Sequence, residues 1–377
     1  MIEIPLDISL GESEIEAVRK LLGREPSDVE LQIFDVLWSE HCSYKSSKPM
    51  LKKHLPVTGP TVVQGPEEDA GILSFTEWQG VHYGVVIGHE SHNHPSQILP
   101  VEGAATGIGG VVRDVICMGA DLIGVLDPLR FGDPQGPNAE ECGAIARGVV
   151  SGIAQYGNAL GVPNLGGDLF FDGSFDKNCL VNVVALGLLE CDRIVNSAVP
   201  QEAKKEPYVL VLVGKPTDSS GFGGATMASK VFGEDHEEGE NRGAVQIPDP
   251  FLKRVLNVAL REFYDRMDAR RIPFGCKDLG AGGISCMASE IAERGGFGIE
   301  LDLDAAPVAE DLPAHVLAVA ETQERYGLAV PERWAEDVLK LFNEEFALPT
   351  IYRGACAAVI GRFVSDPVVR IAHKGDL

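Results

Sequence analysis

The sequence predicts a two-domain protein that mixes α+β and α/β architecture. Its 377 residues are too many for one ordinary core and fit two domains of common size. Segments with strand character alternate with segments of helical periodicity on both sides of a charged stretch at 201–206. Several strand pairs have hairpin-like spacing, which favours α+β layers over a purely parallel doubly wound sheet.

Three regions are expected along the chain. Residues 1–55 form a helical segment, residues 56–200 an N-terminal α+β domain, and residues 205–370 a C-terminal α/β domain. The boundary between the two domains is placed at 200–207, where the composition shifts to polar and charged residues.

The N-terminal segment has the periodicity of helices. Residues 12–22 carry apolar side chains at helical spacing. Ser27 offers an N-cap for a second helix, and Glu30 follows three positions later, as in a capping box. That helix is expected to run towards Trp38 and to end near the polar cluster at 39–45.

The first domain is expected to start with a hairpin. Strands at 71–75 and 82–87 are joined through Gln79 and Gly80. The later elements are a glycine-rich start of a helix at 103–119, a strand at 122–126, a helix at 140–156 and a strand at 181–188.

The second domain repeats this alternation with different elements. Its helices are expected at 250–267, 283–293 and 331–346, the last beginning at Pro331. Its strands are expected at 208–213, 273–276, 298–303 and 357–364, with a glycine-rich loop at 220–224. The acidic run at 234–241 is interpreted as a solvated loop.

Composition excludes several classes of partner and site. A net charge of −24 repels phosphate backbones and anionic lipids, so nucleic acid and membranes are poor partners. The eight cysteines contain no CxxC pair, which argues against a zinc ribbon or a thioredoxin-type site. Neither a signal peptide nor a run of 18 apolar residues occurs in the sequence. We therefore expect a reduced, soluble, cytoplasmic protein.

The densest group of reactive side chains is the stretch at 90–96, directly after a predicted strand. Alternation along the strand end would place Glu90, His92 and His94 on one face. A carboxylate and two imidazoles in that position suit metal binding and proton transfer. The alternative is a polar turn with one histidine satisfied by backbone groups.

A second candidate is the glycine-rich stretch at 103–114. It is neither a dinucleotide fingerprint, because Val112 stands where the third glycine would fall, nor a Walker loop. Glycine-rich helix starts can still offer free N–H groups to anions, with Arg113 for phosphate and Asp114 for Mg²⁺. Tight packing of a helix against a sheet also selects glycine and is the alternative.

Two further stretches are weak signals by themselves. Asp278 lies at a predicted strand end and precedes a glycine-rich helix start, a geometry that suits metal or phosphate. The polar stretch at 321–325 is interpreted in isolation as a helix cap or a surface turn.

Together these motifs resemble one family. The stretches at 40–45, 90–96, 103–119 and 321–325 have the order and spacing of the synthetase subunit of phosphoribosylformylglycinamidine synthase, of the small type. The resemblance implies an aminoimidazole-ribonucleotide-synthetase-like unit, with an N-terminal α+β half-barrel domain and a C-terminal α/β domain. It also implies ATP-dependent conversion of formylglycinamide ribonucleotide (FGAR) to its amidine in purine biosynthesis. ATP phosphorylates the amide oxygen, and ammonia attacks the iminophosphate.

The resemblance also assigns roles to residues. It implies His41 and His92 as catalytic residues, with His92 as proton acceptor, and Tyr44 as an ATP contact. The implied Mg²⁺ ligands are Glu90, Asp114 and Asp278. The implied substrate contacts are Ser91, His92, Asn93, His94, Arg113, Gln246, Glu321, Thr322 and Gln323.

Two departures concern ATP. The family often has a basic residue two positions before the magnesium glutamate, and Gly88 stands there. The loop at 215–220 also lacks the usual basic–Asp–Gly arrangement.

The length matches the first of the family's two homologous halves. We therefore expect partnership with a second synthetase half or a homodimer, and ammonia supplied by a glutaminase subunit with a small accessory subunit. The alternatives are a non-catalytic partner or regulatory half, a paralogous ATP enzyme, and a metal-dependent hydrolase built on His92 and His94.

Overall fold

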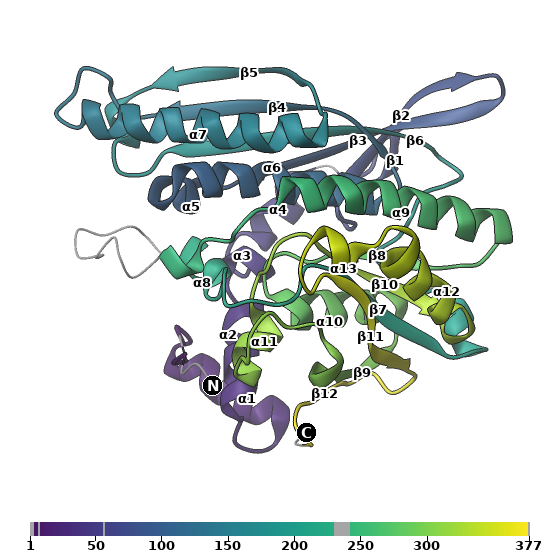
Figure 1. The fold of residues 1–377 in the computed structure, drawn as a ribbon. Coiled ribbons are helices and arrows are strands. Elements are labelled where there is room, and N and C mark those ends of the chain that lie inside the picture. Colours follow the sequence, from purple (N-terminus) through teal and green to yellow (C-terminus); the bar gives the residue numbers. More distant parts are fainter. Residues whose placement is uncertain (1–3, 7, 56, 230–241, 376–377) are drawn as a thin grey trace.

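The computed structural model describes residues 4–6, 8–55, 57–229 and 242–375 (Figure 1). Two six-stranded sheets lie on opposite sides of a layer of helices. The expected two-domain organisation with mixed sheets is confirmed, whereas the domain limits inferred from the sequence stay predictions. The acidic run at 234–241 lies outside the described residues.

The N-terminal segment is helical, as expected. Its helices are α1 (Glu12–Leu22), α2 (Asp28–Leu37), α3 (Glu40–Ser43) and α4 (Lys48–His54). The capping box is present, because the Ser27 hydroxyl accepts from the Glu30 N–H and Glu30 accepts from the Ser27 N–H. The buried carboxylate of Asp35 accepts from the hydroxyls of Ser9 and Thr226, which ties α2 to the second domain.

The first sheet has the strand order β1-β2-β3-β6-β4-β5. Its strands are β1 (Val62–Gln64), β2 (Gly71–Trp78), β3 (Val81–Ser91), β4 (Asp121–Phe131), β5 (Asn164–Phe171) and β6 (Leu180–Glu190). Its helices are α5 (Asn93–Ile98), α6 (Pro100–Cys117), α7 (Ala139–Leu160), and the short 3-10 turns Gly173–Phe175 and Gln201–Lys204. The predicted hairpin is confirmed, with φ of 54° at Gln79 and 82° at Gly80.

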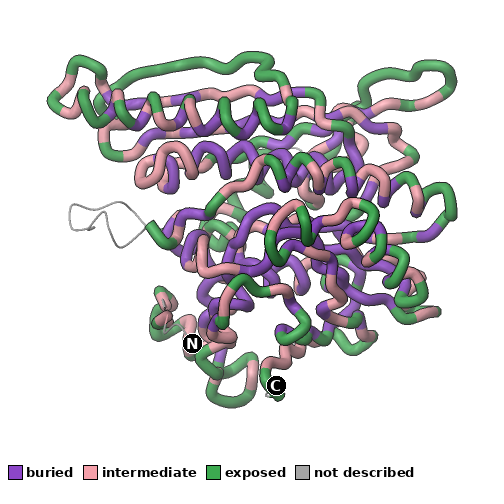
Figure 2. Tube along the Cα trace, viewed as in Figure 1, coloured by how far each residue is buried: buried purple, intermediate pink, exposed green. Residues whose placement is uncertain are grey.

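One face of the first sheet is covered and the other is open. In β6 every second residue is buried, because one face packs on α6. Figure 2 shows the exposed residues along β2 and β5 at the outer side of this sheet. Strand β5 was not predicted; it lies at the edge of this sheet beside β4, and none of its own residues is buried.

The second sheet is covered on both faces and has the order β12-β9-β11-β7-β10-β8. Its strands are β7 (Tyr208–Gly214), β8 (Gly275–Asp278), β9 (Gly298–Asp302), β10 (Arg325–Pro331), β11 (Cys356–Val364) and β12 (Val369–Ala372). Alternate side chains of the fully buried β7 enter two different cores. One core continues through α6 to the first sheet, so the two domains share apolar packing.

Helices cover both faces of this sheet. The α-helices are α8 (Gly224–Ala228), α9 (Pro250–Arg270), α10 (Gly283–Gly295), α11 (Ala314–Val319), α12 (Ala335–Lys340) and α13 (Leu348–Ile351). The remaining turns are Arg242–Ala244, Leu303–Ala305 and Glu332–Trp334, with a π-helical turn at Leu341–Glu345. None of the helices in the described part of the chain combines the length and apolarity needed to cross a membrane.

The end of the second domain corrects two predictions. The helix expected at 331–346 is broken into a 3-10 turn, α12 and a π-helical turn, and Pro331 ends strand β10 instead of starting a helix. The polar stretch at 321–325 is no surface turn, because all five residues are buried where they lead into β10. Several of their hydrogen-bond partners lie far away in the sequence, so the polarity of the stretch by itself wrongly indicated a position at the surface.

The glycine-rich stretch of the first domain lies inside α6 and not ahead of it. Its backbone N–H groups belong to the body of a helix, so they form no anion-binding helix start. A Cβ on Gly103 would lie 2.5 Å from the Pro95 carbonyl carbon, and one on Gly109 would lie 2.6 Å from the Tyr156 hydroxyl. The glycines therefore serve close packing, the alternative weighed for this stretch.

Candidate active site

The chain turns sharply at the end of β3. Strand β3 ends at Ser91, and His92 is the N-cap of α5 with φ −130° and ψ 59°. The expectation that Glu90, His92 and His94 share one strand face is therefore wrong, since His94 is already helical. Pro95 lies in the first turn of α5, where a residue without an N–H is tolerated but could not continue a sheet ladder.

His92 is held by its backbone and its ring. Its N–H donates to the Val181 carbonyl at 2.8 Å, and its carbonyl accepts from the Ser96 hydroxyl at 2.5 Å. Ring atom Nδ1 lies 2.5 Å from the Gly103 carbonyl, so Nδ1 carries the hydrogen and Nε2 is an acceptor. Burial lowers the pKa of His92 to about 4, although the Gly103 contact opposes this shift. The ring is therefore neutral near pH 7, and its unprotonated Nε2 is the atom at which it could accept a proton.

The neighbouring loop residues have different tasks. The side-chain oxygen of Asn93 accepts from the Val181 N–H at 2.8 Å, which fixes the loop to β6. Ser91 is exposed at the end of β3, and His94 is half-buried in the first turn of α5. Asn93 therefore anchors this loop to the backbone of the sheet.

Two carboxylates meet between β3 and α6. Burial raises the pKa of Asp114 well above its ordinary value, and the charge of Glu90 and a hydrogen bond with it act in the same direction. Gly110 leaves room for this pair, because a Cβ there would lie 3.1 Å from a Glu90 carboxylate oxygen.

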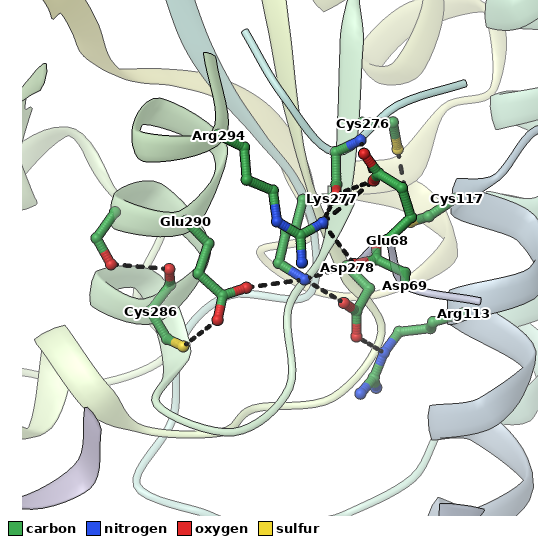
Figure 3. A network of polar contacts seen from close by, with 12 residues as sticks. Glu68, Asp69, Arg113, Cys117, Cys276, Lys277, Asp278, Cys286, Glu290 and Arg294 are labelled. Carbon is green, nitrogen blue, oxygen red and sulfur yellow. Dashed lines mark hydrogen bonds and ion pairs between the residues drawn. The ribbon is translucent and has the colours of Figure 1, made fainter. Parts of the chain in front are cut away.

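Arg113 connects the two domains in this region. Its Nε donates to the Asp278 carboxylate at 3.2 Å, and its Nη1 donates to the side-chain oxygen of Gln323. Figure 3 shows Asp278 between Arg113 and Lys277, whose Nζ is 3.5 Å from the other carboxylate oxygen. Burial would raise the pKa of Asp278, but these two cations outweigh it and lower the pKa.

Two residues of this cluster were not foreseen from the sequence. Lys277 Nζ lies 2.7 Å from Asp69 and 3.1 Å from Glu290, so it neutralises several carboxylates at once (Figure 3). Burial raises the pKa of Asp69 to about 6, and one of its oxygens has no hydrogen-bond partner within the described residues. The acidic run at 67–69 before a strand was the available signal.

The carboxylates of Glu90, Asp114 and Asp278 are chemically suited to a hard divalent cation, but in this structure they do not converge on one point. Carboxylate oxygens are the ligands that Mg²⁺ prefers, and the carboxyl groups of Glu90 and Asp114 are already adjacent. Across the described ranges, no three His, Cys, Asp or Glu side chains are close enough together to hold a metal ion. A ligand role for Asp278 requires its ion pairs with Arg113 and Lys277 to rearrange.

The residues expected to bind substrate from the second domain are buried. The Glu321 carboxylate accepts from the Ala225 N–H and from the Gln246 amide, each at 2.7 Å. Thr322 is bonded to Asp218 through its hydroxyl. The side-chain oxygen of Gln246 is buried and has no hydrogen-bond partner within the part of the chain described.

The N-terminal segment lies over this region. His41 on α3 is exposed, and its charge affects the pKa values of both His92 and Glu321, which places it near the two. Tyr44 has a left-handed backbone with φ 52°. About half of its surface, 53%, is exposed, but partial desolvation of the hydroxyl and then the charge of Glu90 raise its pKa. The structure thus places His41 near His92 and Glu321, and Tyr44 near Glu90.

Known proteins are similar in sequence to this chain over almost its whole length. The domain described as "AIR synthase related protein, N-terminal domain" matches residues 67–189, and the C-terminal domain of that description matches 208–374. The formylglycinamide ribonucleotide amidotransferase linker domain matches residues 2–45. Phosphoribosylformylglycinamidine synthase subunit PurL of Methanothrix thermoacetophila is 51% identical over 369 residues, 98% of this chain and 47% of that relative.

The chain belongs to the PurL family. It spans about half the length of the curated PurL relatives it matches. Thermotoga maritima PurL complexed with FGAR has a TM-score of 0.80 and 33% identity, covering 97% of this chain and 54% of that one. The same protein complexed with ATP has a TM-score of 0.76 and 32% identity, covering 97% and 53%. PurLQS of that organism has a TM-score of 0.75 and 31% identity, covering 96% and 52%.

Gly88 is one of the two positions at which the sequence predicts a departure in ATP binding. Gly88 is buried on the face of β3 that packs on α6, where a Cβ would lie 3.1 Å from Val111. In the loop at 215–220, Lys215 is also buried, 3.3 Å from Asp218, and it donates to the Ile247 carbonyl. Neither position presents a free cation to a nucleotide in this conformation.

Proposed function

We propose that this chain is one half of a PurL-type synthetase that converts FGAR to formylglycinamidine ribonucleotide with ATP and ammonia. The observation that carries the proposal is Arg113, which joins Asp278 and Gln323 beside His92 and Asp114. A fixed guanidinium suits a phosphorylated sugar, because it offers a planar fork of donors. The cytoplasmic location and the use of Mg²⁺ belong to the same proposal.

Each group has a task in this proposal. His92, neutral and with Nε2 unprotonated, accepts a proton as ammonia adds to the activated amide carbon; a positioned base contributes roughly 10²–10⁴-fold. Arg113 and Gln323 orient the ribonucleotide. Mg²⁺, when bound, would neutralise the charge of the transferred phosphoryl group, with Glu90 and Asp114 as its nearest oxygen ligands. Tyr44, close to both carboxylates, is assigned to ATP.

The protein partners that we propose are suggested by the uncovered face of the first sheet and by the family. The uncovered face of the first sheet carries apolar side chains on β2, β3 and β6, where Leu73 is paired with Val85 and Ile87 with Leu186. We propose that a second synthetase half, or a second copy of this chain, covers this face. A glutaminase subunit and a small accessory subunit are proposed to deliver ammonia.

Substrate binding tests the proposal directly. Calorimetry with FGAR is expected to show saturable binding to the intact chain, and Arg113→Lys is expected to weaken it by about tenfold or more, because the bidentate fork is lost. Arg130→Lys is the matched control, since Arg130 on β4 pairs with the exposed Asp168 on β5. Absence of FGAR binding by the unaltered chain would refute the proposal.

A binding half without catalysis is the second candidate. The buried Gly88, which supplies no cation, favours it. Turnover separates the two candidates: the chain assembled with a second half, FGAR, ATP, Mg²⁺ and an ammonium salt is expected to form the amidine. The isolated chain is expected to form none. If the assembled enzyme is inactive while FGAR still binds, the binding role is the correct one.

A further inference from the structure

A buried hydrogen bond joins the two domains behind the candidate site. Tyr156 on α7 has no exposed surface, and its hydroxyl donates to the Glu324 carboxylate at 2.6 Å. Glu324 comes directly before β10 in the other domain and is 1% exposed. The contact therefore links residues 168 positions apart at the centre of the molecule.

The path of the tyrosine ring depends on one glycine of α6. A Cβ on Gly109 would lie 2.6 Å from the Tyr156 hydroxyl oxygen and 2.8 Å from the ring carbon that bears it. Any side chain at Gly109 would thus displace the ring. α6 also carries Arg113, so the glycine and the guanidinium are one helical turn apart.

Glu324 has an uncommon backbone conformation. Its φ is +56°, a region that is costly for residues other than glycine, by roughly 1–3 kcal/mol. Its carbonyl accepts from the Lys215 N–H at 3.2 Å, and Gly214 is required beside that carbonyl, because a Cβ there would collide with it. The second carboxylate oxygen of Glu324 is buried without a hydrogen-bond partner among the described residues. The Tyr156 hydroxyl is therefore a principal contact that fixes this side chain.

The left-handed turn at Glu324 separates the directions of its two neighbours. Gln323, before the turn, accepts from Arg113 through its side-chain oxygen. Arg325, after the turn, is fully buried and donates to the carbonyls of Thr322 and Ala320. If Glu324 relaxed to an ordinary φ, these two side chains could not both keep their partners.

We propose that Tyr156 and Glu324 are positioning residues: their hydrogen bond holds the left-handed turn that places Gln323 against Arg113. The inference rests on the proposed function only in that Arg113 and Gln323 are the expected contacts of the ribonucleotide. Neither Tyr156 nor Glu324 needs to touch the substrate. Gly109 contributes to the same arrangement because its missing side chain leaves room for the Tyr156 ring to pass α6.

The test compares two buried tyrosines in the full chain. Tyr156→Phe removes the hydroxyl that reaches Glu324, and Tyr208→Phe removes a buried hydroxyl that donates to the Pro273 carbonyl at 3.0 Å, away from the site. Both variants are expected to melt at a lower temperature. Only Tyr156→Phe is expected to weaken FGAR binding by calorimetry, by about tenfold, with ATP–Mg²⁺ binding changed by less than about twofold. Glu324→Gln keeps an acceptor for the Tyr156 hydroxyl and is expected to retain near-normal FGAR affinity.

A crystal structure of Tyr156→Phe decides the inference independently of the function. It is expected to show the Gln323 side chain separated from Arg113; retention of that contact would overturn the inference. Equal FGAR affinity in Tyr156→Phe and the unaltered chain would also overturn it. If the unaltered chain binds no FGAR, the proposed function fails, and the crystal structure still judges the turn. If Tyr156→Phe does not fold, Gly109→Ala, which displaces the ring, is expected to separate the same pair.

Discussion

At the scale of single residues, Lys253 is an ionisable side chain that the folded protein removes completely from water. It is fully buried on α9, donates to the Tyr326 hydroxyl at 2.5 Å and lies 4.6 Å from the centre of that ring. Burial lowers its pKa from 10.5 to about 7, and the charge of Arg113 adds to the shift while Glu324 opposes it. Such a group makes stability depend on pH in the alkaline range.

The sign of that dependence follows from the direction of the shift. Between about pH 7 and 10.5 the unfolded chain holds the Lys253 proton more tightly than the folded chain, so the free energy of unfolding rises with pH across this window. We expect Lys253→Met to remove this contribution, up to about 1.4 kcal/mol per pH unit. Urea unfolding of both proteins near pH 7 and near pH 9 measures it. Lys340→Met, at an exposed position of α12, is the control, and an unchanged pH slope in Lys253→Met would contradict the prediction.

At the scale of elements, α6 is the helix on which the two domains meet. All residues from Gly103 to Cys117 are buried, between β3 and β6 on one side and β8 on the other. A helix covered on all sides can approach other backbones closely only where side chains are absent. The small residues of this helix are thus a packing requirement.

Gly103→Ala tests that requirement. The new Cβ would lie 2.5 Å from the backbone of Pro95 and Ser96, and backbone cannot give way as a flexible side chain can. We expect a loss of about 1–3 kcal/mol in the free energy of unfolding. Gly143→Ala in α7 is the matched control, because its Cβ would meet only an arginine side-chain atom at 3.4 Å. That variant is expected to gain about 0.5–1 kcal/mol, and equal losses in both would refute the packing argument.

At the scale of the whole molecule, the two sheets differ in how they are covered. The second sheet has helices on both faces, whereas the first leaves one face open. Large apolar side chains are exposed on that sheet, namely Leu73, Phe75, Trp78, Ile87, Leu165, Leu169, Phe170 and Phe171. Successive residues of β5 point to opposite faces of this edge strand, so the part of this set on the open face includes Leu73 and Ile87. Exposed apolar side chains of this size are unfavourable in water and favour association.

Sedimentation velocity measures this association. We expect the unaltered chain to sediment as a dimer or larger species at micromolar concentration. Ile87→Lys places a charge on the open face opposite Leu186 and is expected to shift the population to monomer, because a buried unpaired charge is costly. Leu21→Lys in α1, where the leucine is already 68% exposed, is expected to leave the species unchanged. A strictly monomeric unaltered chain would contradict the expectation.

Local sequence predicted those features whose causes are local. The Ser27 cap, the Gln79–Gly80 turn and the strand at 208–213 each follow from side chains that act on their own backbone or their own face. The broken helix after Pro331 and the edge strand β5 were not predicted, because pairing with distant strands decides them. The motif at 90–96 was found from its composition, but the turn at His92 was not.

What the sequence determined by itself is the alternation of strands and helices in two domains, the family and the residue types that gather at the site. Only the tertiary structure decided that the polar stretch at 321–325 is buried and that Lys277 reaches Asp69. Only the tertiary structure also shows that the Tyr156 ring passes Gly109 and donates a hydrogen bond to Glu324. The physical reason is that a buried charge or a left-handed turn is stable only with its partner, and each of these partners lies far away along the chain.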